Sequence, residues 1–74
     1  MKLPVISGYE LVKFLVKQGF VVVGRKGSHV RLKKNISSKL LVTVVPLHHR
    51  LDPGTLLGIL RQCELSREDF LRLQ

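Results

Sequence analysis

Residues 19–46 read GFVVVGRKGSHVRLKKNISSKLLVTVVP and predict three consecutive β-strands joined by short turns. The segment Phe20–Val23 is β-branched and too short for a buried helix, which favours a strand. From His29 to Lys34 apolar and polar residues alternate, as they do in a strand with one buried face. Leu40–Val45 forms a third apolar run, and Pro46 closes it. Short loops between the three segments indicate an antiparallel meander.

Helices are expected on both sides of this stretch. Ser7 and Glu10 form a capping box, so a helix over residues 8–18 follows, and Gly19 is well placed to end it. After the strands, Asp52-Pro53 supplies a cap and a first-turn proline for a second helix. Ser66–Asp69 begins a short third helix. The expected fold class is α+β, in the order helix, three strands, helix, with the helices on one face of the sheet and a short extra C-terminal helix.

The chain length allows one domain, residues 1–74, with a thin core and a shallow functional site. The single cysteine, Cys63, excludes an internal disulfide and is expected to be a reduced core thiol. No signal peptide is visible, and no apolar run approaches the roughly 18 residues of a membrane span. These features predict a cytoplasmic protein with no membrane partner.

Positive charge is concentrated in the middle of the chain. The chain has 13 Lys and Arg against 5 Asp and Glu, a formal charge of +8. Residues 25–50 carry seven of the cations and no acid. Such a concentration weakens a fold by self-repulsion unless a polyanion neutralises it, and nucleic acid is the commonest one. The alternative is a solvated, solubilising surface.

The segment Gly24–Arg31 contains the candidate catalytic and phosphate-binding residues. Gly27 lets the backbone turn and approach a phosphate closely, and Ser28 adds a hydroxyl donor. His29 lies among cations and can act as a general base, because histidine changes protonation near neutral pH. RNA carries its own nucleophile, the 2′-hydroxyl, so such a base needs no metal or cofactor. The phosphate and RNA contacts are expected from Arg25, Lys26, Gly27, Ser28, Arg31 and Lys33.

The sequence gives less support to a second histidine site, a metal site or a cysteine nucleophile. His48 and His49 lie in the loop before the second helix, and His48 is a secondary candidate as a general acid or phosphate contact. The chain shows no cluster of ligands for a metal site, so no metal and no cofactor are expected. Cys63 lies on an apolar helix face and is poorly placed as a nucleophile.

The first and third strands are apolar at nearly every position. Helices on a single face of the sheet would leave Val21, Val23 or their neighbours exposed, which indicates a protein partner. The alternative is that the terminal helix covers them. The four aromatic side chains are expected in the core; they are Tyr9, Phe14, Phe20 and Phe70.

Taken together, these motifs resemble the HicA toxins over almost the whole chain. The pieces that carry the resemblance are, in chain order, Val5–Lys13, Gly19-Phe20, Gly27-Ser28-His29, Val42–His48, Gly54-Thr55-Leu56, Ile59–Gln62 and Leu65–Phe70. In one departure, Cys63-Glu64 stands where the family commonly has Ala-Gly, so the cap of the second helix is expected to differ.

The resemblance implies a double-stranded-RNA-binding-domain-like (dsRBD-like) fold and a ribosome-independent mRNA endonuclease, neutralised by a HicB antitoxin encoded beside it. It also implies that His29, within Gly27-Ser28-His29, is the catalytic residue. The resulting hypothesis is the toxin of a type II toxin–antitoxin system, a metal-independent endoribonuclease with mRNA and a HicB-like protein as partners.

Two alternatives stay open at this point: a non-catalytic RNA-binding module that uses the same basic face, and a chain that acts mainly as half of a protein complex. The oligomeric state stays open too.

Overall fold

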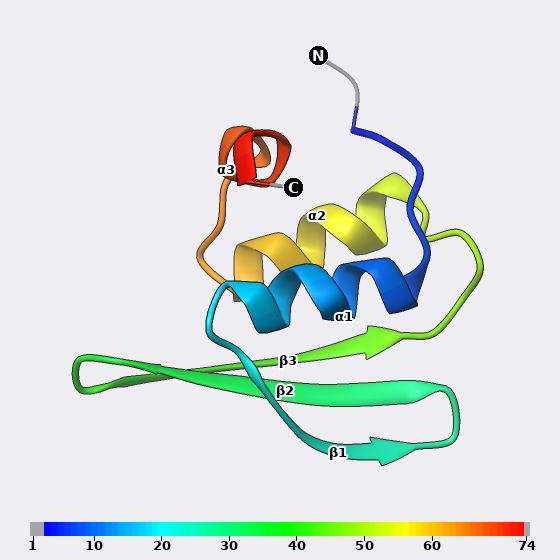
Figure 1. Ribbon diagram of the computed structural model, residues 1–74. Helices are drawn as coiled ribbons and strands as arrows, with labels where there is room; N and C mark the ends of the chain where they lie inside the picture. The colour runs from blue at the N-terminus through cyan, green and yellow to red at the C-terminus, as the bar shows by residue number, and fades with distance from the viewer. Residues whose placement is uncertain (1–2, 74) are drawn as a thin grey trace.

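The structure is a computed structural model that describes residues 3–73 as an antiparallel sheet with helices on one side (Figure 1). Strand β2 lies between β1 and β3, so the sheet order follows the chain. In chain order the elements are α1 (Gly8–Lys17), β1 (Val21–Lys26), β2 (His29–Ile36), β3 (Lys39–Pro46), α2 (Pro53–Gln62) and α3 (Arg67–Leu73). The predicted α+β class, the element order and the dsRBD-like arrangement are confirmed.

The strands are longer than their apolar segments suggested. Strand β1 was expected over Phe20–Val23, but it runs from Val21 to Lys26, because backbone pairing with β2 continues as far as Lys26 opposite His29. The ladder needs only backbone groups, so it extends through charged residues at the exposed end of the hairpin. A bulge between Val22 and Gly24 interrupts the register.

Helices α1 and α2 lie side by side on one face of the sheet (Figure 1). The alternation predicted for β2 is confirmed, because Val30 and Leu32 are buried while His29, Arg31 and Lys33 are exposed. The side chains buried in the core come from the three helices, from β2 and β3, and from the segments that flank them; the largest that are fully buried include Phe70, Leu11, Leu15, Leu32, Leu56 and Leu60. We call the other side of the sheet, which none of the described helices covers, the open face.

Helix α3 does not cover the open face. It packs on the helical layer, on the side away from the sheet (Figure 1), where Phe70 meets Phe14 edge to face at 4.9 Å between ring centroids. The suggestion that the terminal helix covers the sheet valines is therefore wrong. The placement of Tyr9 in the core is also wrong, because its side chain is 55% exposed in the first turn of α1. No helix among residues 3–73 is long and apolar enough to cross a membrane.

The first two helices end in the same way, in a Schellman motif. In α1 the Phe20 N–H donates to the Leu15 carbonyl (3.0 Å), and Gly19 has φ +99°. In α2 the Leu65 N–H donates to the Leu60 carbonyl (2.9 Å), and Glu64 has φ +57°. The cap of α2 was expected to differ, but it keeps the backbone geometry that glycine favours, although the residue there is Glu64.

We expect Glu64→Gly to raise the free energy of unfolding by about 1 kcal/mol, because a left-handed backbone costs a residue with a Cβ roughly that amount. The substitution removes the ion pair between Lys39 and Glu64, but both side chains are well exposed and such pairs contribute little. Urea unfolding of the variant beside the wild type measures the difference. A less stable variant would contradict the assignment of strain to Glu64.

Candidate functional site

His29 is held at the tip of the β1–β2 hairpin. Lys26 and His29 form the last pair of the ladder, and Gly27-Ser28 makes the two-residue turn between them. Gly27 has φ +58°, as expected for a hairpin turn with glycine first. The Arg25 Nε donates to the Gly27 carbonyl (3.0 Å), which braces the turn. The predicted catalytic histidine therefore lies on a braced tip and is exposed.

The segment after β3 lies beside this tip. On β3 the partner of His29 is Pro46, and the next residue, Leu47, donates its N–H to the Ser28 carbonyl (2.6 Å). The His48 carbonyl then accepts a hydrogen bond from the Gly8 N–H at the start of α1 (2.9 Å). The structure thus brings the loop that carries His48 to the same end of the sheet as His29.

The sheet register separates the predicted contact residues into two sets. Lys26 pairs with His29, and Arg31 and Lys33 follow His29 at alternate positions of β2, so all four share the open face. Arg25 pairs with the buried Val30 and therefore lies on the helical side of the sheet. Four of the predicted site residues are brought together on one face, and Arg25 contributes to the turn instead.

Two further strand cations are occupied elsewhere. The Lys34 Nζ donates to the Gln18 carbonyl at the end of α1 (2.6 Å) and lies 5.8 Å from the centre of the Phe20 ring. Lys39 pairs with Glu64. Helix and cap groups hold these two side chains, so the cations free to meet a ligand on the sheet are Lys26, Arg31 and Lys33.

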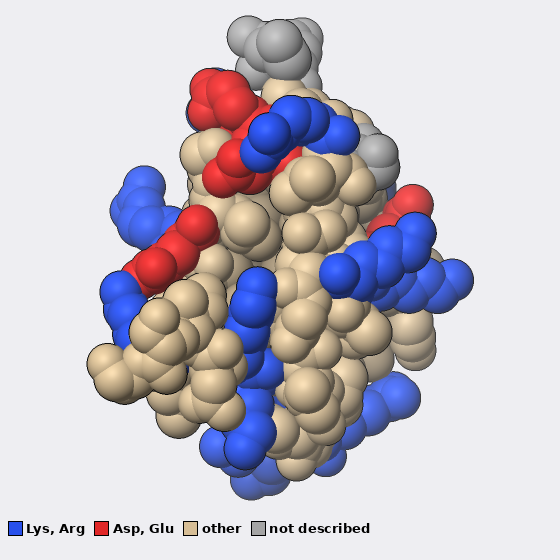
Figure 2. Space-filling model, turned by 60° about the vertical axis from the view of Figure 1, so that its left-hand side comes forward, with Lys and Arg blue, Asp and Glu red and all other residues tan. Residues whose placement is uncertain are grey.

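Acidic residues are confined to the helical layer. All five belong to helices or their flanking residues: Glu10, Asp52, Glu64, Glu68 and Asp69. Figure 2 shows the result, with red atoms over the upper, helical part and blue atoms as the only charged ones at the lower end, where the sheet lies. The open face therefore offers positive charge without acidic neighbours, and a polyanion would bind there rather than over the helices.

An apolar row lies directly beside the basic residues. On β3, Val44 pairs with Arg31 and Val42 pairs with Lys33, and these valines are 41% and 46% exposed. We call Val42 and Val44 the valine row. The sequence suggested exposed valines on the first strand but did not single out these two, although the unbroken apolar run of the third strand was the signal that could have found them.

Other groups in the described chain do not assemble a second catalytic site. The Cys63 thiol is 3% exposed, and burial raises its pKa to about 11, so it is not a nucleophile at neutral pH. Within residues 3–73, no three His, Cys, Asp or Glu side chains are grouped so that they could hold a metal ion.

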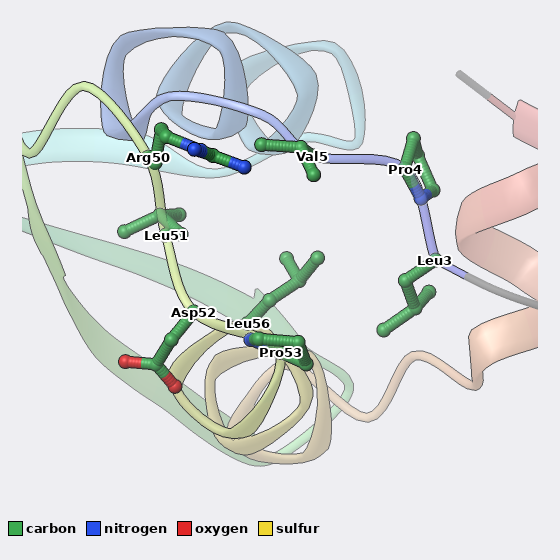
Figure 3. Close-up of a pocket in the computed structure, with 8 residues that line it drawn as sticks. All are labelled: Leu3, Pro4, Val5, Arg50, Leu51, Asp52, Pro53 and Leu56. Carbon is green, nitrogen blue, oxygen red and sulfur yellow. The ribbon is translucent and has the colours of Figure 1, made fainter.

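A shallow hollow of about 380 Å³ lies between the N-terminal segment and the start of α2 (Figure 3). Its walls are largely apolar, the Arg50 side chain extends toward Val5, and the Asp52 carboxylate points away from the centre. Asp52 caps α2, and the hydrogen bond from the Thr55 backbone N–H (2.8 Å) holds the pKa of its carboxyl below the usual value. Because the carboxylate among its lining residues, Asp52, accepts hydrogen bonds from Thr55 as the cap of α2, the His29 end of the open face is the better candidate site.

One comparison with known protein families found a match. A family model described as the HicA toxin of bacterial toxin–antitoxin systems matches residues 8–65. The chain belongs to the HicA toxin family. The match runs from α1 to just beyond α2 and includes the whole sheet, whereas helix α3 lies outside it. No curated protein and no solved structure matched the chain.

Membership gives the general role of the molecule. A HicA-family chain is the toxin of a toxin–antitoxin system, and such toxins are generally ribonucleases. The role implies an RNA substrate and an antitoxin partner. All the predicted site residues fall within the matched residues 8–65 of this HicA-family chain.

Proposed function

We propose that this HicA-family protein is an mRNA endonuclease of a type II toxin–antitoxin system that cleaves without metal and uses His29 as the general base. One observation carries the proposal: His29 is exposed on the braced hairpin tip and shares the open face with Lys26 and Arg31. A base and two cations then face the same bound phosphate group.

The reaction uses the nucleophile that RNA supplies. His29 accepts the proton of a 2′-hydroxyl, whose oxygen attacks the adjacent phosphorus while the bond from phosphorus to the 5′ oxygen breaks. The products are a 2′,3′-cyclic phosphate and a 5′-hydroxyl, and the leaving oxygen takes a proton from an acid. Lys26 and Arg31 stabilise the charge that develops on the phosphorane. His48, in the adjoining loop, is the candidate acid, and the Gly27-Ser28 turn allows close approach of the phosphate.

The experiment that tests this mechanism follows the 2′-hydroxyl. Purified protein is incubated in chelator with an mRNA fragment, and the cleavage site is mapped. We expect fragments that end in a 2′,3′-cyclic phosphate and a 5′-hydroxyl, and no cleavage when the ribose at the mapped site is replaced by 2′-deoxyribose. Uncut RNA with binding retained would favour the non-catalytic module, and cleavage at the deoxy site would contradict the mechanism.

The antitoxin in this proposal is a HicB-like protein, and the pair acts in the cytoplasm. A surface with exposed cations and valines is one that a protein inhibitor can cover. A HicB-like reading frame beside the gene, whose product restores growth of cells that express this chain, is the expected finding. Rescue that needs an unrelated protein would argue for a different complex.

A further inference from the structure

We propose that the open face binds an unpaired, extended RNA strand along β2, with phosphates on the basic residues and bases on the valine row. The inference rests on the proposed ribonuclease function for the identity of the polyanion. It adds the form of the substrate, single-stranded rather than duplex, and it assigns Val42 and Val44 as base-contacting residues.

The pairing of β2 with β3 repeats a unit of one cation and one valine, which is complementary to a nucleotide. Arg31 lies beside Val44, and two residues further along β2 Lys33 lies beside Val42. Each unit therefore places a cation next to an exposed apolar side chain on the neighbouring strand, about 5 Å away. A nucleotide has the same composition, a phosphate and a largely apolar base face separated by a sugar. Two successive units accept two successive nucleotides.

The spacing along the strand also suits an extended chain. Side chains on one face of a strand recur about every 7 Å, which is close to the distance between successive phosphorus atoms of an extended polynucleotide. His29 continues the same line as Arg31 and Lys33, at the end of β2. An RNA strand in this position brings its next phosphate to His29. The bond that is cleaved then lies at one end of the bound RNA segment.

A duplex fits this face poorly. Base pairing turns the base faces inward, so a duplex would set phosphates and sugars against the valine row and leave it without an apolar contact. The helical layer is a poorer alternative surface, because the acids of the chain lie there and offset the positive charge of its lysines and arginines. Attack by the 2′ oxygen also requires it to stand opposite the leaving 5′ oxygen, a geometry that an unpaired strand reaches more easily than a stacked duplex.

Charge favours RNA over an apolar protein surface as the ligand of the open face. Lys26, Arg31 and Lys33 have no acidic neighbour on the strands, so the apolar row is bordered by uncompensated positive charge. A purely apolar protein surface would leave these cations desolvated and unpaired, at a cost. A polyanion with apolar bases pairs with the cations and also covers the valine row.

The test uses an uncleavable ligand, so that it does not depend on catalysis. Binding of a short 2′-O-methyl oligonucleotide to the full chain is measured by fluorescence anisotropy over a range of salt, as a single strand and as a duplex of the same sequence. We expect the single strand to bind about tenfold more tightly than the duplex. Equal or tighter binding of the duplex would overturn the proposal.

Variants distinguish the contribution of the basic residues from that of the valine row. Arg31→Ala and Lys33→Ala should each reduce the slope of log affinity against log salt by about 0.7, the value for one contact to a single-stranded phosphate. Val42→Thr with Val44→Thr should weaken binding about fivefold with the slope unchanged, since apolar contact is lost and charge is not. Lys13→Ala and Val16→Thr on the exposed side of α1 are the matched controls and should bind as wild type does.

Each result is decisive for one of the two proposals. Wild-type affinity of the double valine variant, or a loss of antitoxin binding alone, would overturn the role of the valine row in RNA binding. Selective binding of the single strand by a protein that cuts no RNA would support this inference and remove the ribonuclease proposal. Cleavage of RNA by a protein that prefers the duplex would do the reverse.

Discussion

His29→Ala should lower the rate of RNA cleavage by about a hundredfold or more, the usual contribution of a positioned general base. The side chain is exposed and makes no hydrogen bond to the described residues, so its removal leaves the fold intact. Affinity for an uncleavable oligonucleotide should change little, because Lys26, Arg31 and Lys33 remain. Single-turnover cleavage of a labelled RNA, measured beside circular dichroism of the same preparation, checks the expectation.

A second histidine provides the control. His49 is also exposed and lies in the loop after β3, so His49→Ala removes a similar side chain at the same end of the molecule. It should cleave at the wild-type rate and still arrest growth on expression, whereas His29→Ala should do neither. If His29→Ala cleaved as fast as the control, the general base would have to be another group.

Periodicity made much of the site predictable. On a half-buried strand, only one orientation places every apolar residue of an alternating pattern in the core. The shared face of His29, Arg31 and Lys33 therefore followed from their spacing. Caps were predictable for a similar reason, because Ser7 and Glu10 interact over one helical turn. The structure confirms that box, with the Ser7 hydroxyl accepting from the Glu10 N–H (3.1 Å).

Features that depend on cross-strand register were not predictable in the same way. Arg25 and Lys26 are neighbours in the chain, yet pairing places only Lys26 on the face of His29. The match between Val44 and Arg31 depends on the length of the β2–β3 turn, which composition does not fix. The contact of α1 with the end of β3 joins residues almost forty positions apart. Nothing in the local sequence indicates this contact except the glycine at position 8.

That glycine carries the second prediction: Gly8→Ala should lower the free energy of unfolding by about 3 kcal/mol. A Cβ built on Gly8 would lie 2.0 Å from the Pro46 carbonyl oxygen and 2.8 Å from the Leu47 Cα. Both neighbours are backbone atoms, so neither can rotate away. Relief requires α1 to move off the end of β3, which breaks the bond from the Gly8 N–H to the His48 carbonyl (2.9 Å).

The same substitution elsewhere should have the opposite sign. Gly58 lies inside α2 with nothing within 4 Å of its built Cβ, so Gly58→Ala should stabilise the protein by about 0.5–1 kcal/mol through helix propensity. Thermal and urea unfolding of both variants measure the two changes. Leu47, whose Cα lies beside Gly8, also donates its N–H to the Ser28 carbonyl, so cleavage by Gly8→Ala should fall even where the variant remains folded. A Gly8→Ala protein as stable and active as wild type would show that the start of α1 is not fixed against the end of β3.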